Sequence, residues 1–448
     1  MANPSLQIGN SNWAIKEDNL LGYSTAGTRF VPQPITMTRA SAGTRVNSSG
    51  LVETVELLGS EEVTNGDFAT DSDWAKAPSG VTISGGSANF NSSSDTYVYQ
   101  DILTATKTYK IIFSGTINSG SLYIGENGVA TNIYTAGTYT NEVAYFTVAS
   151  SVRFIIRKNG AGTLDATIDN ISVKESTKNN LARVDYDGTA SSLLVEPERT
   201  NNLTASQDLT DSFWNSSTRL ETVVASTVLS PDGTTFGFKA IPTTNNSTKY
   251  LDYDYGFLSM PSSSEATYSI FVKPFGYTNF QIATSSGFSS RYQNFELTGD
   301  GIIGTGDVNG ATIDKVGEWY RCSITQTTTG TTPRVLSIPT PSSGLGRNPT
   351  FTGNGTDGVL LWGASLEVGS YPTSYIPNLS TTSGSTVTRV QDQYSKTGIS
   401  NLINSEEGVL FVEMAALSDD TSTKLISLND GVGNDKIELG YFGGNSLF

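Results

Sequence analysis

Histidine is absent from this 448-residue chain, and its absence removes several kinds of active site. A Ser-His-Asp triad, a Cys-His pair and a histidine metal centre all need an imidazole. The single cysteine, Cys322, cannot form an internal disulfide. It alternates with Tyr320 and Ile324, which predicts a small buried residue in a strand. We therefore expect a non-catalytic protein, because any enzyme here would depend on carboxylates, hydroxyls or amines alone.

Charged residues are also scarce, and most of them are acidic. Only 16% of residues are charged and the formal net charge is −16, which disfavours binding to nucleic acid and to anionic membrane surfaces. No apolar run approaches the roughly 18 residues that span a bilayer. The first residues lack the basic start and apolar core of an export signal. The sequence thus predicts no nucleic-acid partner, no membrane insertion and no signal peptide.

Short strands fill the chain instead. Runs rich in Val, Ile, Tyr, Phe and Thr recur between Gly, Asn, Asp and Ser. This pattern predicts an all-β protein of tandem antiparallel jelly-roll sandwiches with an extended N-terminal segment. The expected parts are an N-terminal attachment segment (1–60), a first jelly roll (61–176), a connector (177–192), a second jelly-roll sandwich (193–377), a flexible linker (378–404) and a partial sandwich (405–448).

The two sandwiches share a weak internal repeat. The sequence TDSDW at 70–74 returns as TDSFW at 210–214, and the closing strand at 168–173 is echoed at 360–367. The elements come in the same order, as in a diverged tandem pair. We therefore expect the two modules to superpose with Trp74 near Trp214.

The ends of the first module carry a resemblance to a known family. Residues 65–68 (NGDF), followed by Trp74, open the module, and residues 168–173 (IDNISV) close it. These ends resemble the jelly-roll carbohydrate-binding modules found beside many polysaccharide-degrading enzymes. That family often holds a structural calcium near its first and last strands, which implies Asp67 and Asp169 as ligands, although Ala69 stands where an acid is common. The alternative is that both aspartates cap turns.

The remaining segments resemble bacteriophage tail-fibre and appendage proteins. The resemblance is carried by residues 38–53, 182–201, 214 and 362–376, including the sequences TRASAGTRVN, LLVEPERTN and YPTSYI. In that family the first two pieces often lie close together in sequence, so the first jelly roll is expected to be an insertion. The last residues resemble the opening strands of a concanavalin-A-like sandwich.

This second resemblance implies a virion location and other virion subunits as partners. It also implies a homo-oligomer, with a trimer before other states. Residues 1–60 and 405–448 show no core of their own, so we expect them to pack against other chains.

Tyrosines on one strand of the first module are the candidate ligand-binding residues. Tyr97 and Tyr99 alternate with Val98, so they share a face with Asp95 and Asp101. Aromatic rings stack on sugar C–H surfaces, and carboxylates accept hydrogen bonds from sugar hydroxyls. The alternative is that these rings belong to the core, as most strand aromatics do.

Three functions remain open at this point. The favoured one is a phage virion protein, a tail fibre or appendage, that displays glycan-binding modules to the host cell surface. The second is a purely structural virion protein, such as a head fibre, a head decoration or a tail scaffold. The third is a fragment of a polysaccharide-degrading enzyme. An exposed aromatic groove favours the first, large apolar interfaces the second, and a cleft with paired carboxylates the third.

Overall fold

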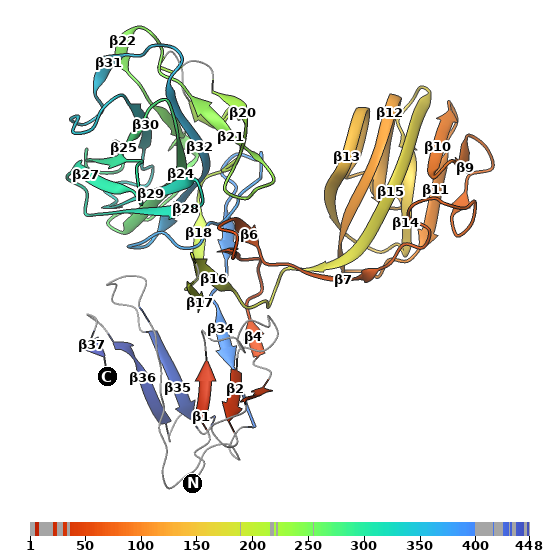
Figure 1. Cartoon of the computed structure of the whole chain (residues 1–448), viewed down its shortest axis with the longest axis horizontal. Helices are drawn as coiled ribbons and strands as arrows, with labels where there is room; N and C mark the ends of the chain where they lie inside the picture. The colour runs from red at the N-terminus through yellow and green to blue at the C-terminus, as the bar shows by residue number, and fades with distance from the viewer. Residues whose placement is uncertain are drawn as a thin grey trace. The chain divides into compact units, whose positions relative to one another are not determined.

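The computed structural model describes residues 36–188, 190–215, 219–220, 223–253 and 255–398, together with the short stretches 5–8, 21–24, 30–33, 415, 424–429, 431, 436–442 and 446–447. Within these residues the elements are β-strands, apart from the 3-10 helix η1 (Tyr255–Phe257), so the protein is all-β (Figure 1). No helix in this part of the chain is long and apolar enough to cross a membrane. The chain divides into unit 1, which comprises residues 1–55 and 179–448, and unit 2, Glu56–Lys178.

Unit 2 is an antiparallel sandwich whose two layers share the long strand β12 (Thr108–Glu126). One layer contains β13 (Ile133–Thr147), β15 (Leu164–Thr177), β10 (Ser87–Ser92) and β9 (Val81–Ser84). The other contains β14 (Arg153–Asn159), β11 (Tyr97–Asp101) and β8 (Ala75–Lys76). Alternate residues point inward and form one core around Trp74, Phe90, Phe113 and Phe154.

The two ends of unit 2 lie side by side. Strand β7 (Leu57–Glu61) pairs with the end of β15, with Leu57 opposite Thr177. The Lys178 ammonium lies 3.8 Å from the Glu56 carboxylate. The module therefore begins before the expected residue 61, because β7 completes its sheet. Since unit 1 continues on both sides of it, unit 2 is an insertion in the sequence of unit 1.

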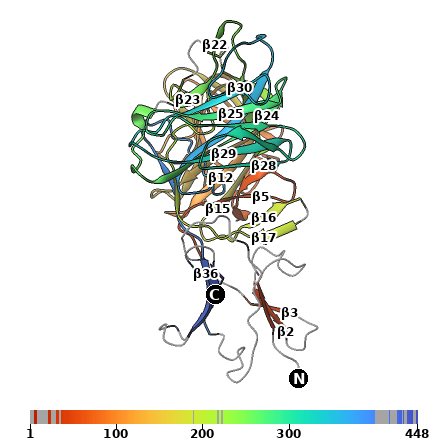
Figure 2. The ribbon, with the colours of Figure 1, turned by 90° about the vertical axis from the view of Figure 1, so that its left-hand side faces the viewer.

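Unit 1 contains a second antiparallel sandwich, made of two six-stranded sheets (Figure 2). The first sheet consists of β19 (Trp214–Asn215), β23 (Leu251–Tyr253), β30 (Val335–Thr340), β25 (Asn279–Thr284), β26 (Tyr292–Glu296) and β27 (Ile302–Gly306). The second consists of β20 (Val224–Leu229), β21 (Phe236–Ala240), β32 (Gly358–Val368), β24 (Glu265–Phe275), β29 (Trp319–Thr327) and β28 (Gly310–Val316).

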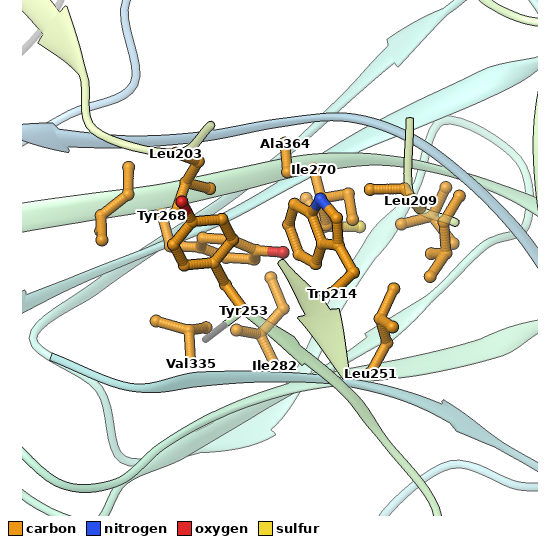
Figure 3. Packing of buried hydrophobic residues seen from close by; sticks show 14 of the residues in the cluster. Leu203, Leu209, Trp214, Leu251, Tyr253, Tyr268, Ile270, Ile282, Val335 and Ala364 are labelled. Carbon is orange, nitrogen blue, oxygen red and sulfur yellow. The ribbon is translucent and has the colours of Figure 1, made fainter. Parts of the chain in front are cut away.

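The core of this sandwich lies between the two sheets. Trp214, Tyr253 and Tyr268 gather there with aliphatic side chains from both layers (Figure 3). Cys322 is fully buried in the same core with Tyr320 and Ile324, which confirms the interpretation of the cysteine as a core residue.

Shorter pairs complete the described strands. They are β1 (Ser5–Ile8) with β2 (Leu21–Ser24) and β3 (Phe30–Gln33), β4 (Thr36–Thr38) with β34 (Gln393–Ser395), β5 (Thr44–Val46) with β6 (Val52–Thr54), β16 (Val184–Asp187) with β17 (Ala190–Leu193), β18 (Arg199–Asn201) with β33 (Val387–Arg389), and β22 (Asn246–Thr248) with β31 (Thr350–Thr352). In the expected partial sandwich, β35 (Lys424–Asn429), β36 (Lys436–Phe442) and β37 (Ser446–Leu447) form a three-stranded sheet. The strand expected at 408–414 lies outside the described residues.

Both sandwiches contain the same pair of hydrogen bonds, which join a tryptophan and the closing strand to the opening loop. We call this arrangement the clasp. The Nε1 of Trp74 donates to the carbonyl of Asn65 at 3.0 Å, and that of Trp214 donates to the carbonyl of Ala205, also at 3.0 Å. Each acceptor lies nine residues before its tryptophan and has a positive φ, 53° for Asn65 and 50° for Ala205. The two tryptophans thus occupy equivalent positions, as the sequence repeat predicts.

The closing strand completes the clasp. Ile171 of β15 donates its N–H to the carbonyl of Gly66 at 2.8 Å, and Ala364 of β32 donates to that of Ser206 at 3.0 Å. In each strand the residue before the donor has a positive φ, 49° and 61° respectively: Asn170 and Gly363. A Cβ on Gly66 would lie 2.1 Å from the Ile171 carbonyl oxygen, so this approach requires glycine in unit 2.

The described end of the N-terminal segment packs within unit 1, which corrects one expectation. The hairpin of β5 and β6 places Val52 against the aromatic cluster of Trp319 and Trp362. The N–H of Val52 donates to the carbonyl of Pro231 at 2.9 Å. The β5–β6 hairpin therefore covers a sheet face of its own chain, because burying that aromatic surface is favourable.

The expectation of a flexible linker is corrected, because the linker, like the connector, supplies a fully buried arginine. Arg183 of the connector and Arg389 of the linker contact Glu196 at 2.7 and 2.8 Å. Arg39 contacts Asp392 at 2.8 Å, and Arg183 also pairs with Asp392. These five side chains are at most 2% exposed. Residues 378–398 are thus not a free spacer, since their polar groups are held by distant charged partners; residues 399–404 lie outside the described part of the chain.

Candidate ligand-binding face of unit 2

The alternation in β11 sends two tyrosines to the outer side of unit 2. Val98 is fully buried and belongs to the core, and the flanking Tyr97 and Tyr99 are half-buried. Of the two rings, Tyr97 also packs against the core. Asp101 on the same strand and Asp95 just before it are exposed. The four residues expected to form a ligand face are therefore accessible from the same side of the strand.

The neighbouring strand β14 brings two arginines to this face, and the sequence analysis did not identify them. In the register, Arg157 lies opposite Tyr97 and Arg153 opposite Asp101. Arg153 donates to both carboxylate oxygens of Asp101, at 2.9 and 3.4 Å. Arg157 donates to both oxygens of Asp95, at 2.9 and 2.6 Å. The RFIIR sequence at 153–157 places both arginines on one strand face, but nothing local indicates their partners.

Each tyrosine ring is flanked by one of these guanidinium groups. The Cζ of Arg153 lies 3.6 Å from the ring centroid of Tyr99, and that of Arg157 lies 5.7 Å from the ring of Tyr97. The two ring centroids are 6.1 Å apart with planes inclined by 43°. Ile155 lies between the arginines, opposite Tyr99, and is 2% exposed. Cation–π contacts of this kind hold the rings in place on an apolar floor.

The arginine–aspartate hydrogen bonds of this face favour the charged forms of Asp95, Arg157 and Arg153. The hydrogen bond from Arg157 lowers the pKa of Asp95, and the same bond raises the pKa of the Arg157 guanidinium. The hydrogen bond to Asp101 likewise raises the pKa of Arg153. Each pair joins one guanidinium to one carboxylate, so the two formal charges of a pair cancel.

An open depression of about 420 Å³ adjoins Tyr99. It is lined by Thr64, Asp73, Ala75, Tyr99, Gln100, Asp101 and Ile102. The Gln100 amide bonds both the N–H and the carbonyl of Thr64, at 3.1 and 2.7 Å, and so fixes the loop that forms one wall. The site is thus a shallow polar surface beside an aromatic ring rather than an enclosed pocket.

The expected calcium ligands are not brought into a metal-binding group. Asp67 accepts a weak bond from the N–H of Ala69 at 3.3 Å, and Asp169 accepts from the N–H and the side-chain amide of Asn170 at 2.6 and 2.8 Å. No group of three or more Asp, Glu, His or Cys side chains suited to a metal occurs among the described residues. Asp67 makes the turn-capping bond of the alternative interpretation, whereas Asp169 lies within β15 and bonds the neighbouring Asn170.

The buried carboxylates of the described chain are all engaged in structural bonds. Glu126 accepts from three backbone N–H groups, Glu367 from two hydroxyls, and Asp252 from Arg334. Glu196 and Asp392 are held by the arginines of unit 1. None of these carboxylates lines the depression beside Tyr99.

Comparisons with known proteins give little beyond the fold. No protein-family model matches the chain, and no curated protein matches it. A solved structure of the tandem CBM22-1-CBM22-2 domain of Paenibacillus barcinonensis Xyn10C is similar at 8% identity and a TM-score of 0.25, covering 69% of this chain and 98% of that one. The M60 catalytic domain with the CBM51-1 and CBM51-2 domains of Clostridium perfringens ZmpB is similar at 10% identity and a TM-score of 0.20, covering 82% of this chain and 43% of that one.

Proposed function

We propose that this chain is a non-catalytic, glycan-binding subunit of a virus particle, a phage tail fibre or appendage, with unit 2 as its binding module. The observation that carries the proposal is the outward face of β11 and β14. There Tyr97 and Tyr99 stand beside two arginine–aspartate pairs and an open polar depression.

The chemistry of this face suits a sugar. Tyrosine rings present an apolar surface to sugar C–H groups and a hydroxyl to the solvent. Guanidinium N–H groups donate to sugar oxygens, and carboxylates accept from sugar hydroxyls. Because the face is open, a hydrated ligand reaches it without a conformational change. The affinity of one such shallow site is expected to be low, and several copies on one particle raise it through avidity.

The virion part of the proposal rests on the segments that resemble phage appendage proteins. In unit 1 these segments supply Arg39, Arg183 and Glu196 to the buried ionic network, and in the sequence they flank the inserted unit 2. On this proposal the partners are other virion subunits and a host cell-surface glycan, and the chain forms a homo-oligomer, with a trimer as the first state to test. The engagement of the buried carboxylates supports a non-catalytic role.

A purely structural virion role is the second candidate, because unit 1 exposes apolar residues. Leu229 and Phe236 lie opposite each other on β20 and β21 and are 51% and 47% exposed. Ile302 and Ile303 on the edge strand β27 are exposed to a similar degree. Such patches suit contact with another protein chain.

The substitution Tyr99→Ala tests the glycan proposal. We expect it to abolish binding of the full chain to a glycan array or to host cells while shifting the melting temperature little, because the ring lies outside the core. The matched control is Tyr109→Ala, which removes a core ring that is 1% exposed and should cost about 3–5 kcal/mol of stability. A wild-type chain that binds no glycan contradicts the proposal. A melting loss for Tyr99→Ala as large as that of the control shows that Tyr99 is a core residue.

A further inference from the structure

The outward face of unit 2 contains the same set of side chains twice. Each set is one tyrosine, one arginine over its ring and one aspartate bonded through both oxygens: Tyr97 with Arg157 and Asp95, and Tyr99 with Arg153 and Asp101. Both arginines come from β14 and both tyrosines from β11. A repeated set suits a ligand that is itself a repeat.

The spacing of the sets indicates a linear ligand. Tyr97 and Tyr99 are two residues apart, so their backbones are about 7 Å apart along β11. Their ring centroids are 6.1 Å apart, and neither ring stacks face to face on the other. The rings thus lie one after the other along the strand and do not enclose a single sugar between them. A chain of sugars that runs along β11 contacts both.

The charge of the sets indicates a neutral ligand. A ligand carboxylate that approached Arg153 or Arg157 would meet the aspartate already bound there, and like charges at that distance repel. The rest of the chain adds to this repulsion, because its formal net charge is −16. Displacing the aspartate would leave a carboxylate without its partner.

Hydroxyl groups meet no such obstacle. A guanidinium has about five N–H donors and a carboxylate about four acceptor sites, so a pair joined by two hydrogen bonds keeps both kinds free. Neighbouring sugar hydroxyls can accept from the arginine and donate to the aspartate without breaking the ion pair. The intact pair is therefore a ready-made binding group for a diol.

We propose that this face binds a neutral, linear oligosaccharide, with one sugar unit against each tyrosine, and discriminates against uronic and sialic acids. The inference rests on the glycan-binding function proposed above and specifies its ligand class. Asp95 and Asp101 act as specificity-determining residues, because they cancel the positive charge that would otherwise attract acidic sugars.

The test compares neutral and acidic probes on one glycan array. The array carries neutral oligomers of glucose, galactose and mannose beside oligomers of the corresponding uronic acids and sialylated glycans. We expect the full wild-type chain to bind neutral oligomers at least about ten-fold more tightly than acidic ones, and to bind trimers more tightly than single sugars. The variant Asp101→Asn frees the charge of Arg153 and should shift the acidic-to-neutral affinity ratio about ten-fold toward acidic probes.

Matched variants keep the test interpretable. Glu175→Gln breaks the exposed ion pair of Glu175 with Lys107 in unit 2, away from β11, and should leave the ratio unchanged. If Asp101→Asn fails to fold, Asp95→Asn makes the same change in the other set. A wild-type preference for acidic glycans, or an unchanged ratio in the folded aspartate variant, overturns the inference while leaving glycan binding in place. Binding to neither class of probe overturns the proposed function itself.

Discussion

The two sandwiches of this chain share their internal construction but differ at their surfaces. Both are closed by a tryptophan that donates to a carbonyl nine residues earlier and by a closing strand that donates to the opening loop. In unit 1, however, two outer sheet faces are covered by the chain's own segments. The β5–β6 hairpin covers Trp319 and Trp362. The segment 341–349 covers the amides of Gln281 and Asn294, which donate to its carbonyls at 3.0 and 2.7 Å.

Unit 2 leaves the corresponding kind of surface open. Along β11 and β14 the aromatic and charged side chains bond one another, and the carboxylates of Asp95 and Asp101 stay about half exposed. The difference separates two roles for the same fold. A sandwich whose faces are sealed by its own chain suits a rigid platform, and a sandwich with an open aromatic face suits binding. On the proposed function, unit 2 binds the ligand and unit 1 supports it.

The largest effect that separates the units is expected from Arg183→Met. The change leaves the buried carboxylates of Glu196 and Asp392 short of a partner, which should cost unit 1 about 3–5 kcal/mol. Calorimetry of the full chain should show the unit 1 transition at a lower temperature and the unit 2 transition unmoved.

A matched control removes an arginine from an exposed pair of the same unit. Arg291 bonds Asp307, and both side chains are more than two-fifths exposed, so Arg291→Met should cost less than about 1 kcal/mol. Equal shifts of both transitions in Arg183→Met would mean that the two units unfold together. This result would contradict the treatment of unit 1 and unit 2 as separately stable parts.

The next effect concerns the shared clasp. Trp74→Phe and Trp214→Phe each remove one of the two hydrogen bonds that a loop carbonyl accepts, because Asn65 also accepts from the N–H of Phe68 and Ala205 from that of Asp208. Each change also opens a small space in the core, so the loss should be about 1–3 kcal/mol. Since the bonds have the same length and the same spacing, we expect similar losses, each confined to its own unit. Losses that differ by several kcal/mol would show that the tryptophan contributes unequally to the stability of the two sandwiches. Thermal unfolding of the two single variants and the double variant measures this.

The smallest effect is a pair of opposite pH dependences. Burial favours a raised pKa for Glu126 of unit 2, but backbone N–H groups of Ser151, Ala149 and Ser150 outweigh it and hold the pKa below the ordinary 4.5. Burial prevails at Glu367 of unit 1 and raises its pKa. A lowered pKa contributes stability that is lost as the pH falls through the folded-state pKa, whereas a raised pKa contributes stability that is lost as the pH rises through it.

Glutamine variants at the two positions reveal these signs. The unfolding free energy of Glu126→Gln, relative to wild type, should fall as the pH rises toward 4.5 and then level off. That of Glu367→Gln should level off below 4.5 and rise as the pH increases above it. Urea unfolding of each variant and of wild type across the acid range measures both slopes. Slopes of the same sign would show that the pKa values of Glu126 and Glu367 are shifted in the same direction, and the hydrogen-bond donors around them would then not explain a difference.

The features that follow from local sequence were predictable, and those that depend on distant partners were not. Alternation in β11 and the repeated tryptophan are local patterns, so the outward tyrosines and the matched positions of Trp74 and Trp214 could be read from the sequence. The pairing of β11 with β14 is not local, which is why Arg153 and Arg157 were missed.

The buried arginines were missed for the same reason. A Ser- and Thr-rich stretch such as 378–398 has the composition of a spacer, and only its contacts with segments near residues 39, 183 and 196 explain why Arg389 and Asp392 are buried. Burial of charge requires partners, and these partners lie up to 353 positions apart in the sequence.

The adjacent ends of unit 2 also bear on how such a chain changes over evolutionary time. Leu57 pairs with Thr177, and Glu56 lies beside Lys178. The chain therefore enters and leaves the module at almost the same place. A gene segment that encodes residues 56–178 is therefore a cassette that recombination can exchange whole. Any replacement whose own first and last strands are neighbours would fit between the flanking residues without stretching them. The whole module can therefore change in one genetic step while unit 1 is inherited intact.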